Sequence, residues 1–119
     1  MRATVCLAFI LALPLAAHSQ ATGFGVTKCQ EFIDAKPQQN ETAKYLYVAW
    51  SQGFFAGQNA VHAATDHIQL DTPEPDEIMW FMHEYCLKNR SNMYVQGLFA
   101  LTLEVAKGQA AHGTLKQPR

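Results

Sequence analysis

The chain has little charge of either sign and no excess of one sign. Nine Lys and Arg residues stand against ten Asp and Glu residues in 119 positions, which gives a formal charge of −1 at pH 7. A nucleic-acid-binding protein concentrates basic residues, so we expect no nucleic-acid partner. Disorder is also disfavoured, because 49% of the residues are hydrophobic and only 16% are charged. This length and composition predict a single folded domain.

Motifs of catalysis and of cofactor binding are missing as well. The sequence has no C-x-x-C or H-E-x-x-H pair, no Gly-rich phosphate loop, and no Ser-His-Asp or paired-carboxylate pattern. His62 and Asp66 are four residues apart and His67 follows, which would suit either a weak metal pair or a solvated helix end. We favour the helix end. We therefore predict that the protein is not an enzyme and has no cofactor and no metal site.

A long hydrophobic run occurs only at the N-terminus. Arg2 precedes an apolar stretch over residues 4–17, and Ala17 and Ser19 are the small residues that a signal peptidase reads. We expect residues 1–19 to be a signal peptide that is cleaved near Ser19, so that the protein is periplasmic or secreted. No later stretch is long and apolar enough to span a bilayer, and we expect no stable membrane anchor.

Cysteine is scarce, with three residues in the chain. Cys6 lies in the predicted signal peptide, which leaves Cys29 and Cys86. Export would bring these two thiols into an oxidising compartment, where disulfides form and persist. Only one intramolecular pairing is available, so we predict a Cys29–Cys86 disulfide. In chain-entropy terms, closing a loop of this length stabilises a fold by about 4 kcal/mol.

Apolar residues recur at three- and four-residue steps along most of the remaining chain, which is typical of helices. We predict an all-α fold, a small single-domain bundle of about four helices with one disulfide. The helices are expected over residues 28–35 and 41–64, from the Pro-rich and acidic segment 72–77 through Cys86, and from Ser91 or Asn92 to Gly108. The expected organisation is a flexible lead-in at 20–26, a helical domain at 27–108 and a flexible tail at 109–119.

Two glycines, Gly53 and Gly57, lie four residues apart in the predicted central helix. Each costs about 1 kcal/mol relative to alanine within a helix, so both call for a reason. We expect close packing of another helix over them, either inside the domain or at a homodimer interface. Asn59, one turn beyond, either cross-links neighbouring elements by hydrogen bonds or faces water.

Aromatic residues are numerous for a mature chain of about a hundred residues. We expect most of them in the core and identify Trp50, Phe54, Phe55 and Trp80 as candidates for an interaction surface. Trp80 falls beside the apolar stripe of its helix and not within it, so we expect it to be partly exposed as a contact residue.

Two segments resemble the HdeA/HdeB family of periplasmic acid-stress chaperones, and its HdeB branch in particular. They are residues 29–34 with Pro37, and residues 84–86 with Lys88-Asn89 and Tyr94. In that family the matching cysteines form the sole disulfide of a small all-helical domain. The resemblance therefore implies the same fold and an acid-responsive chaperone activity.

The middle of the chain departs from that family. The pattern Trp50-x-x-Gly53-Phe54-x-x-Gly57-x-Asn59 is similar to small exported bacterial proteins of unknown role. The same outline, less closely, resembles the immunity proteins that protect bacteria from type VI-delivered cell-wall amidases (the Rap/Tai kind). That resemblance implies a protein that binds and inhibits a secreted enzyme.

We therefore expect an acid-responsive chaperone first and an inhibitor of a secreted enzyme as the alternative, with an accessory envelope role left open. Without residues 1–19 the chain has eight Lys and Arg against ten Asp and Glu, and its charge swings from −2 to +12 when all carboxylates and its four histidines are protonated. Such self-repulsion would expose apolar surface to unfolded client proteins in acid. In the second function, exposed aromatics would enter the cleft of a secreted enzyme.

Overall fold

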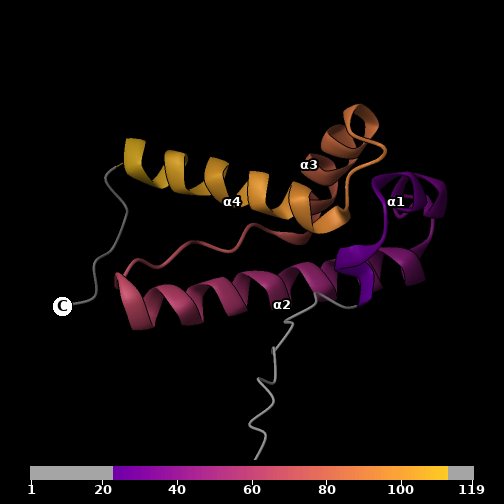
Figure 1. Cartoon of the computed structure of the whole chain (residues 1–119). Coiled ribbons are helices and arrows are strands. Elements are labelled where there is room, and N and C mark those ends of the chain that lie inside the picture. The colour runs from indigo at the N-terminus through magenta and orange to yellow at the C-terminus, as the bar shows by residue number, and fades with distance from the viewer. Residues whose placement is uncertain (1–22, 113–119) are drawn as a thin grey trace, which may run out of the picture.

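Helices make up most of the chain that the structure describes, which is residues 23–112. In this computed structural model the order is a short 3-10 helix η1 (Gly23–Val26), α1 (Cys29–Ala35), α2 (Glu41–Thr65), α3 (Pro75–Lys88) and α4 (Tyr94–Ala111) (Figure 1). The predicted all-α fold of about four helices with one disulfide is confirmed. The predicted signal peptide lies outside the described residues. Within residues 23–112, no helix combines the length and apolarity needed to cross a membrane.

Local signals begin α2 and α3 where the sequence predicts. The Asn40 side-chain oxygen accepts a hydrogen bond from the Ala43 N–H at 3.1 Å. That N–H belongs to the first turn, where backbone donors have no partner within the helix. Pro75 begins α3, and the Glu77 carboxylate accepts the Glu74 N–H at 3.1 Å. Both helices therefore begin at signals contained in a few neighbouring residues.

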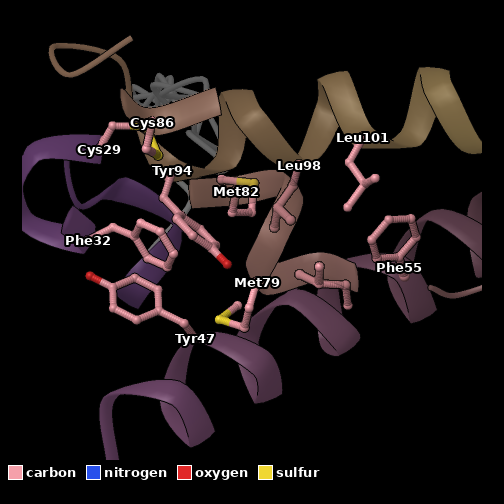
Figure 2. Close-up of a cluster of buried hydrophobic side chains, with 11 residues drawn as sticks. Cys29, Phe32, Tyr47, Phe55, Met79, Met82, Cys86, Tyr94, Leu98 and Leu101 are labelled. Carbon is pink, nitrogen blue, oxygen red and sulfur yellow. A yellow bond between two sulfur atoms is a disulfide. The ribbon is translucent and has the colours of Figure 1, made fainter. Parts of the chain in front are cut away.

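The core gathers around aromatic rings from α1, α2 and α4. The ring centroids of Phe32, Tyr47 and Tyr94 lie 4.9 to 5.2 Å apart (Figure 2). Ser51 donates its hydroxyl hydrogen to the Tyr47 carbonyl at 2.7 Å, so the buried Tyr94 hydroxyl donates to Ser51 Oγ at 2.9 Å. Burial raises the pKa of Tyr94. The rest of the core cluster is apolar and comes from all four helices: Cys29, Phe55, Ile78, Met79, Met82, Cys86, Leu98 and Leu101.

The predicted disulfide between Cys29 and Cys86 is present and ties the start of α1 to the end of α3. Backbone hydrogen bonds surround it. The Cys29 N–H donates to the Asn92 carbonyl at 2.8 Å, and the Tyr94 N–H donates to the Thr27 carbonyl at 2.8 Å. These bonds give partners to donors in the first turns of α1 and α4. They also explain why α4 begins at Tyr94 and not at the Asn92 cap that the sequence suggested.

An irregular connector, residues 66–74, runs back between α2 and α4 to reach α3 (Figure 1). Its middle residue, Leu70, is buried. On one side the Asn59 amide accepts the Leu70 N–H at 2.8 Å and donates to the Leu70 carbonyl at 2.9 Å. On the other side the Gln109 amide accepts the Asp71 N–H at 3.1 Å and donates to the Gln69 carbonyl at 3.3 Å. Two side-chain amides thus supply the backbone partners that neighbouring strands would supply in a sheet.

Two predicted boundaries differ from the structure. Residues 23–26, placed in a flexible lead-in, form η1, whose Gly25 is buried against the indole of Trp50. The predicted flexible tail began at residue 109, but α4 continues to Ala111. Gln109 is buried because its amide holds the connector, and this contact extends the helix beyond Gly108. Residues 113–119 of the predicted tail lie outside the described residues.

The glycines that the sequence singled out are not the closely packed ones. At Gly53 and Gly57 the position that a Cβ would take has no atom of another described element within 4 Å. The prediction of internal helix packing over them is therefore wrong, while the homodimer alternative stays a prediction. Close approach occurs instead at Gly97 on α4, where a Cβ would lie 2.5 Å from the Met82 methyl and 2.8 Å from the Tyr85 ring. The spacing of glycines in a sequence does not show which side of a helix meets a neighbour.

Loss of the disulfide should destabilise the fold strongly. We expect the Cys29→Ala, Cys86→Ala double variant to lose about 4 kcal/mol of unfolding free energy, because the unfolded chain regains the entropy of a long loop. Denaturant unfolding of the variant and of the reduced, alkylated wild type should give similar losses. Mass spectrometry of the exported protein after non-reducing digestion should show the linked peptides. Two thiols that alkylate without reduction would contradict the assignment.

Alanine substitutions at the two kinds of glycine should act in opposite directions. We expect Gly57→Ala to raise the unfolding free energy by about 0.5–1 kcal/mol, since the added methyl meets open space and alanine favours the helix. Gly97→Ala should lower it by about 1–3 kcal/mol through overpacking against Met82 and Tyr85. Thermal melts at several protein concentrations measure both. A lower and concentration-dependent melting temperature for Gly57→Ala would show instead that a second copy covers this face.

Candidate functional site

The four aromatic residues predicted to form an interaction surface differ in how far they are exposed. Phe55 is fully buried in the core, so its assignment to a surface is wrong. Trp50 is half-buried and its indole covers Gly25. Phe54 is half-buried and packs edge-on against Phe55, with ring centroids 5.8 Å apart. The helix α2 is apolar on several sides, and its sequence alone does not show which side the other helices cover.

Trp80 is the exposed member, with 67% of its surface accessible. Ile78 and Met82 of the same helix are fully buried. Trp80 lies two residues from each of them, which is about 200° around an α-helix. Its side chain therefore leaves α3 on the side opposite the core, as the sequence predicts. This position leaves a large apolar ring that a binding partner could remove from water.

Two grooves meet at Trp80. One, of about 580 Å³, lies between α3 and α4 and is lined by Pro73, Asp76, Glu77, Trp80, Leu101, Glu104 and Val105. We call it the α3–α4 groove. The other, of about 480 Å³, lies between α3 and the segment from α1 to the start of α2, and is lined by Pro37, Gln38, Gln39, Lys44, Asp76, Met79, Trp80 and His83. We call it the α2–α3 groove. Trp80 and Asp76 are common to both and form the ridge between them.

An ion pair stands at the ridge. Lys44 Nζ on α2 lies 2.8 Å from the Asp76 carboxylate on α3. The hydrogen bond to Asp76, together with its charge, raises the pKa of Lys44. Pairs at the surface contribute little to stability. The pair links the first turns of α2 and α3 and places one positive charge in the α2–α3 groove.

The predicted helix-end histidines lie far along the chain from Trp80, at the end of α2. His62 Nδ1 lies 2.9 Å from the Asp66 carboxylate, which also accepts the Ile68 N–H at 3.0 Å. The bond from Ile68 and then the bond from His62 lower the pKa of Asp66. The His67 ring nitrogen Nδ1 donates to the Ala63 carbonyl at 3.0 Å. Within residues 23–112, no three His, Cys, Asp or Glu side chains gather as a metal site would require.

The sequence reasoning missed the α3–α4 groove. Leu101 and Val105 fall within the last predicted helix, and Asp76 and Glu77 fall in the acidic segment that begins the helix before it. Neither prediction brought them together with Trp80. A groove between two helices depends on how the helices cross. The sequence signal for it would have been an apolar face on the last helix that is wider than the part buried in the core.

Fluorescence quenching should separate the two tryptophans. We expect Trp80→Phe to remove most of the emission that iodide quenches, because the remaining Trp50 is half-buried. The matched variant Trp50→Phe should keep that quenchable emission. The unfolding free energy of Trp80→Phe should also stay within about 0.5 kcal/mol of the wild-type value, as is usual for surface substitutions. Equal quenching of the two variants would contradict the exposure of Trp80.

Comparisons with protein-family models, with curated proteins and with solved structures gave no match for this chain. Its likeness to the acid-stress chaperones and to the amidase-immunity proteins therefore rests on the short segments quoted above. The function has to be argued from the site itself.

Proposed function

We propose that this protein is an exported binding protein that docks a folded protein partner on the Trp80 surface, defined as Trp80 and the two grooves beside it. The observation that carries the proposal is the indole of Trp80, two-thirds exposed at 67% and standing between two grooves. Tryptophan is among the residues that most often dominate binding energy at protein interfaces. Its large apolar ring gains much when a partner removes it from water.

The support beneath Trp80 favours a specific partner. Met79 and Met82 beside it are buried in the core, and the disulfide holds the end of the same helix through Cys86. At its beginning the Glu77 carboxylate accepts the Glu74 N–H. A surface that is already ordered before binding loses little entropy when the partner arrives. This arrangement suits a folded partner with a complementary cleft.

The partner's compartment follows from the disulfide and from the predicted signal peptide. A Cys29–Cys86 bond is consistent with an oxidising compartment such as the periplasm. A folded partner met there would be another exported protein. Inhibition of a secreted enzyme, with a cell-wall amidase as the example that the central segment suggests, is the role that fits this surface best.

A second candidate, an acid-responsive chaperone for unfolded clients, is favoured by Asp66. Its carboxylate fastens the end of α2 to the connector, and its pKa is lowered by the Ile68 N–H and then by His62. A lowered folded-state pKa means that this stabilisation is complete above the ordinary carboxyl pKa. It is lost as the pH falls through the folded value. Acid would thus loosen the connector over Leu70 while the disulfide still holds the other end of the domain.

One experiment separates the two. The full chain, carrying its own signal peptide and a C-terminal tag, is expressed in the source bacterium, and partners are captured at neutral pH. We expect a captured exported protein whose affinity falls at least about tenfold with Trp80→Ala, the loss typical of an interface hot spot. Tyr45→Ala is the matched control, because Tyr45 is 72% exposed and lines neither groove.

The possible outcomes distinguish the binding protein from the chaperone. A partner that binds the wild type and Trp80→Ala equally would contradict the proposal. Absence of any neutral-pH partner, together with suppression of client aggregation only in acid and independent of Trp80, would favour the chaperone. Light scattering of a client protein, titrated from neutral to acidic pH, measures that suppression.

A further inference from the structure

We infer that the α3–α4 groove receives a lysine or arginine side chain of the partner, whose cationic head group lies against the indole of Trp80. The inference rests on the proposed function, because it names the chemistry of the partner at the same surface. The observation behind it is that the floor of this groove is formed by apolar residues and its rim by acidic ones.

The floor and wall of the groove are apolar. Leu101 and Val105 come from one side of α4, Pro73 from the end of the connector, and Trp80 from α3. Leu101 is nearly buried at 6% exposure, while Trp80 stands open. An apolar stem laid here would cover both the leucine and one face of the indole.

The rim is acidic. Asp76 and Glu77 come from the first turn of α3, and Glu104 comes from α4. None of the residues that line this groove is a lysine, arginine or histidine. The groove therefore combines an apolar floor with negative charge on two sides.

The rim carboxylates have contacts of their own, and these contacts leave room for a ligand. Asp76 pairs with Lys44, Glu104 pairs with Lys107 at 2.9 Å, and Glu77 accepts the Glu74 N–H. The two ion pairs are exposed, and such pairs exchange readily with other cations. An ionised carboxylate has about four lone-pair sites on its two oxygens, so each can accept further donors.

Lysine and arginine match this combination of features. Their aliphatic stems lie along apolar surface while the charged head stays among polar groups. A cation over an indole face gains a further electrostatic attraction, which is strongest with tryptophan. The α2–α3 groove on the other side of Trp80 contains Lys44, so a cation there would meet like charge. The charges thus direct a basic side chain to the α3–α4 groove.

The test uses a small probe and does not require the partner. N-acetyl-arginine methylamide is titrated into the isotope-labelled, disulfide-bonded protein, and the Trp80 indole N–H resonance is followed by NMR. We expect a saturable shift that weakens with added NaCl. The Glu77→Gln, Glu104→Gln double variant should bind the probe about fivefold more weakly, the effect of removing two exposed charge contacts.

Two controls make the result specific. The citrulline counterpart of the probe has nearly the same shape without the charge and should produce little shift. The Asp34→Asn, Glu41→Gln double variant removes the same number of negative charges outside the groove and should bind the arginine probe as the wild type does. Equal shifts from citrulline, or equal binding by the Glu77→Gln, Glu104→Gln variant, would overturn the inference.

The inference and the proposed function can fail separately. If partner capture depends on Trp80 but is unchanged in the Glu77→Gln, Glu104→Gln variant, the docking surface stands and the basic side chain is wrong. If capture does not depend on Trp80, the proposed function is wrong, whatever the probe shows.

Discussion

The helix α1 has seven residues, too few to be stable as an isolated helix in water. Its place in the fold depends on one corner, where the Cys29–Cys86 disulfide joins it to α3 and backbone hydrogen bonds join it to the loop before α4. That corner brings Phe32 against Tyr47 and Tyr94, and so it unites the core. These bonds join residues that lie close together in the fold but far apart in the sequence. A covalent link between such residues removes much of the entropy of the unfolded chain, and this matters most in a small domain.

The same corner holds the proposed binding surface. Cys86 ends the buried stripe of α3 to which Ile78 and Met82 also belong, and Trp80 points away from that stripe. Whatever orders the buried side of α3 therefore orders the exposed side. Gly97 contributes from α4, because its missing side chain lets α4 approach Met82 and brings Leu101 and Val105 to the edge of the α3–α4 groove.

The opposite end of the domain is held by weaker means. The amides of Asn59 and Gln109 and the carboxylate of Asp66 fasten the connector to the two helices that flank it, together with bonds from His67 to α2. The buried backbone of Leu70 takes both of its partners from Asn59, and a buried backbone group that loses its partner costs about 1–3 kcal/mol. The domain thus has a covalent corner at one end and a hydrogen-bonded connector at the other.

The sequence by itself determined the helices, because the Asn40 cap, the proline at the start of α3 and the apolar periodicity act over a few residues. It also determined the disulfide, because two cysteines allow only one pairing. It placed Trp80 beside the buried stripe of its helix, since such a position can be read from helical geometry alone, and the structure then showed how far the side chain is exposed. Only the tertiary structure decided that Phe55 is core, that Gly25 and Gly97 are closely packed while Gly57 is not, and that Gln109 belongs to the domain. It alone formed the α3–α4 groove as well, because a groove depends on how two helices cross, and the crossing is set by side chains far apart in the chain.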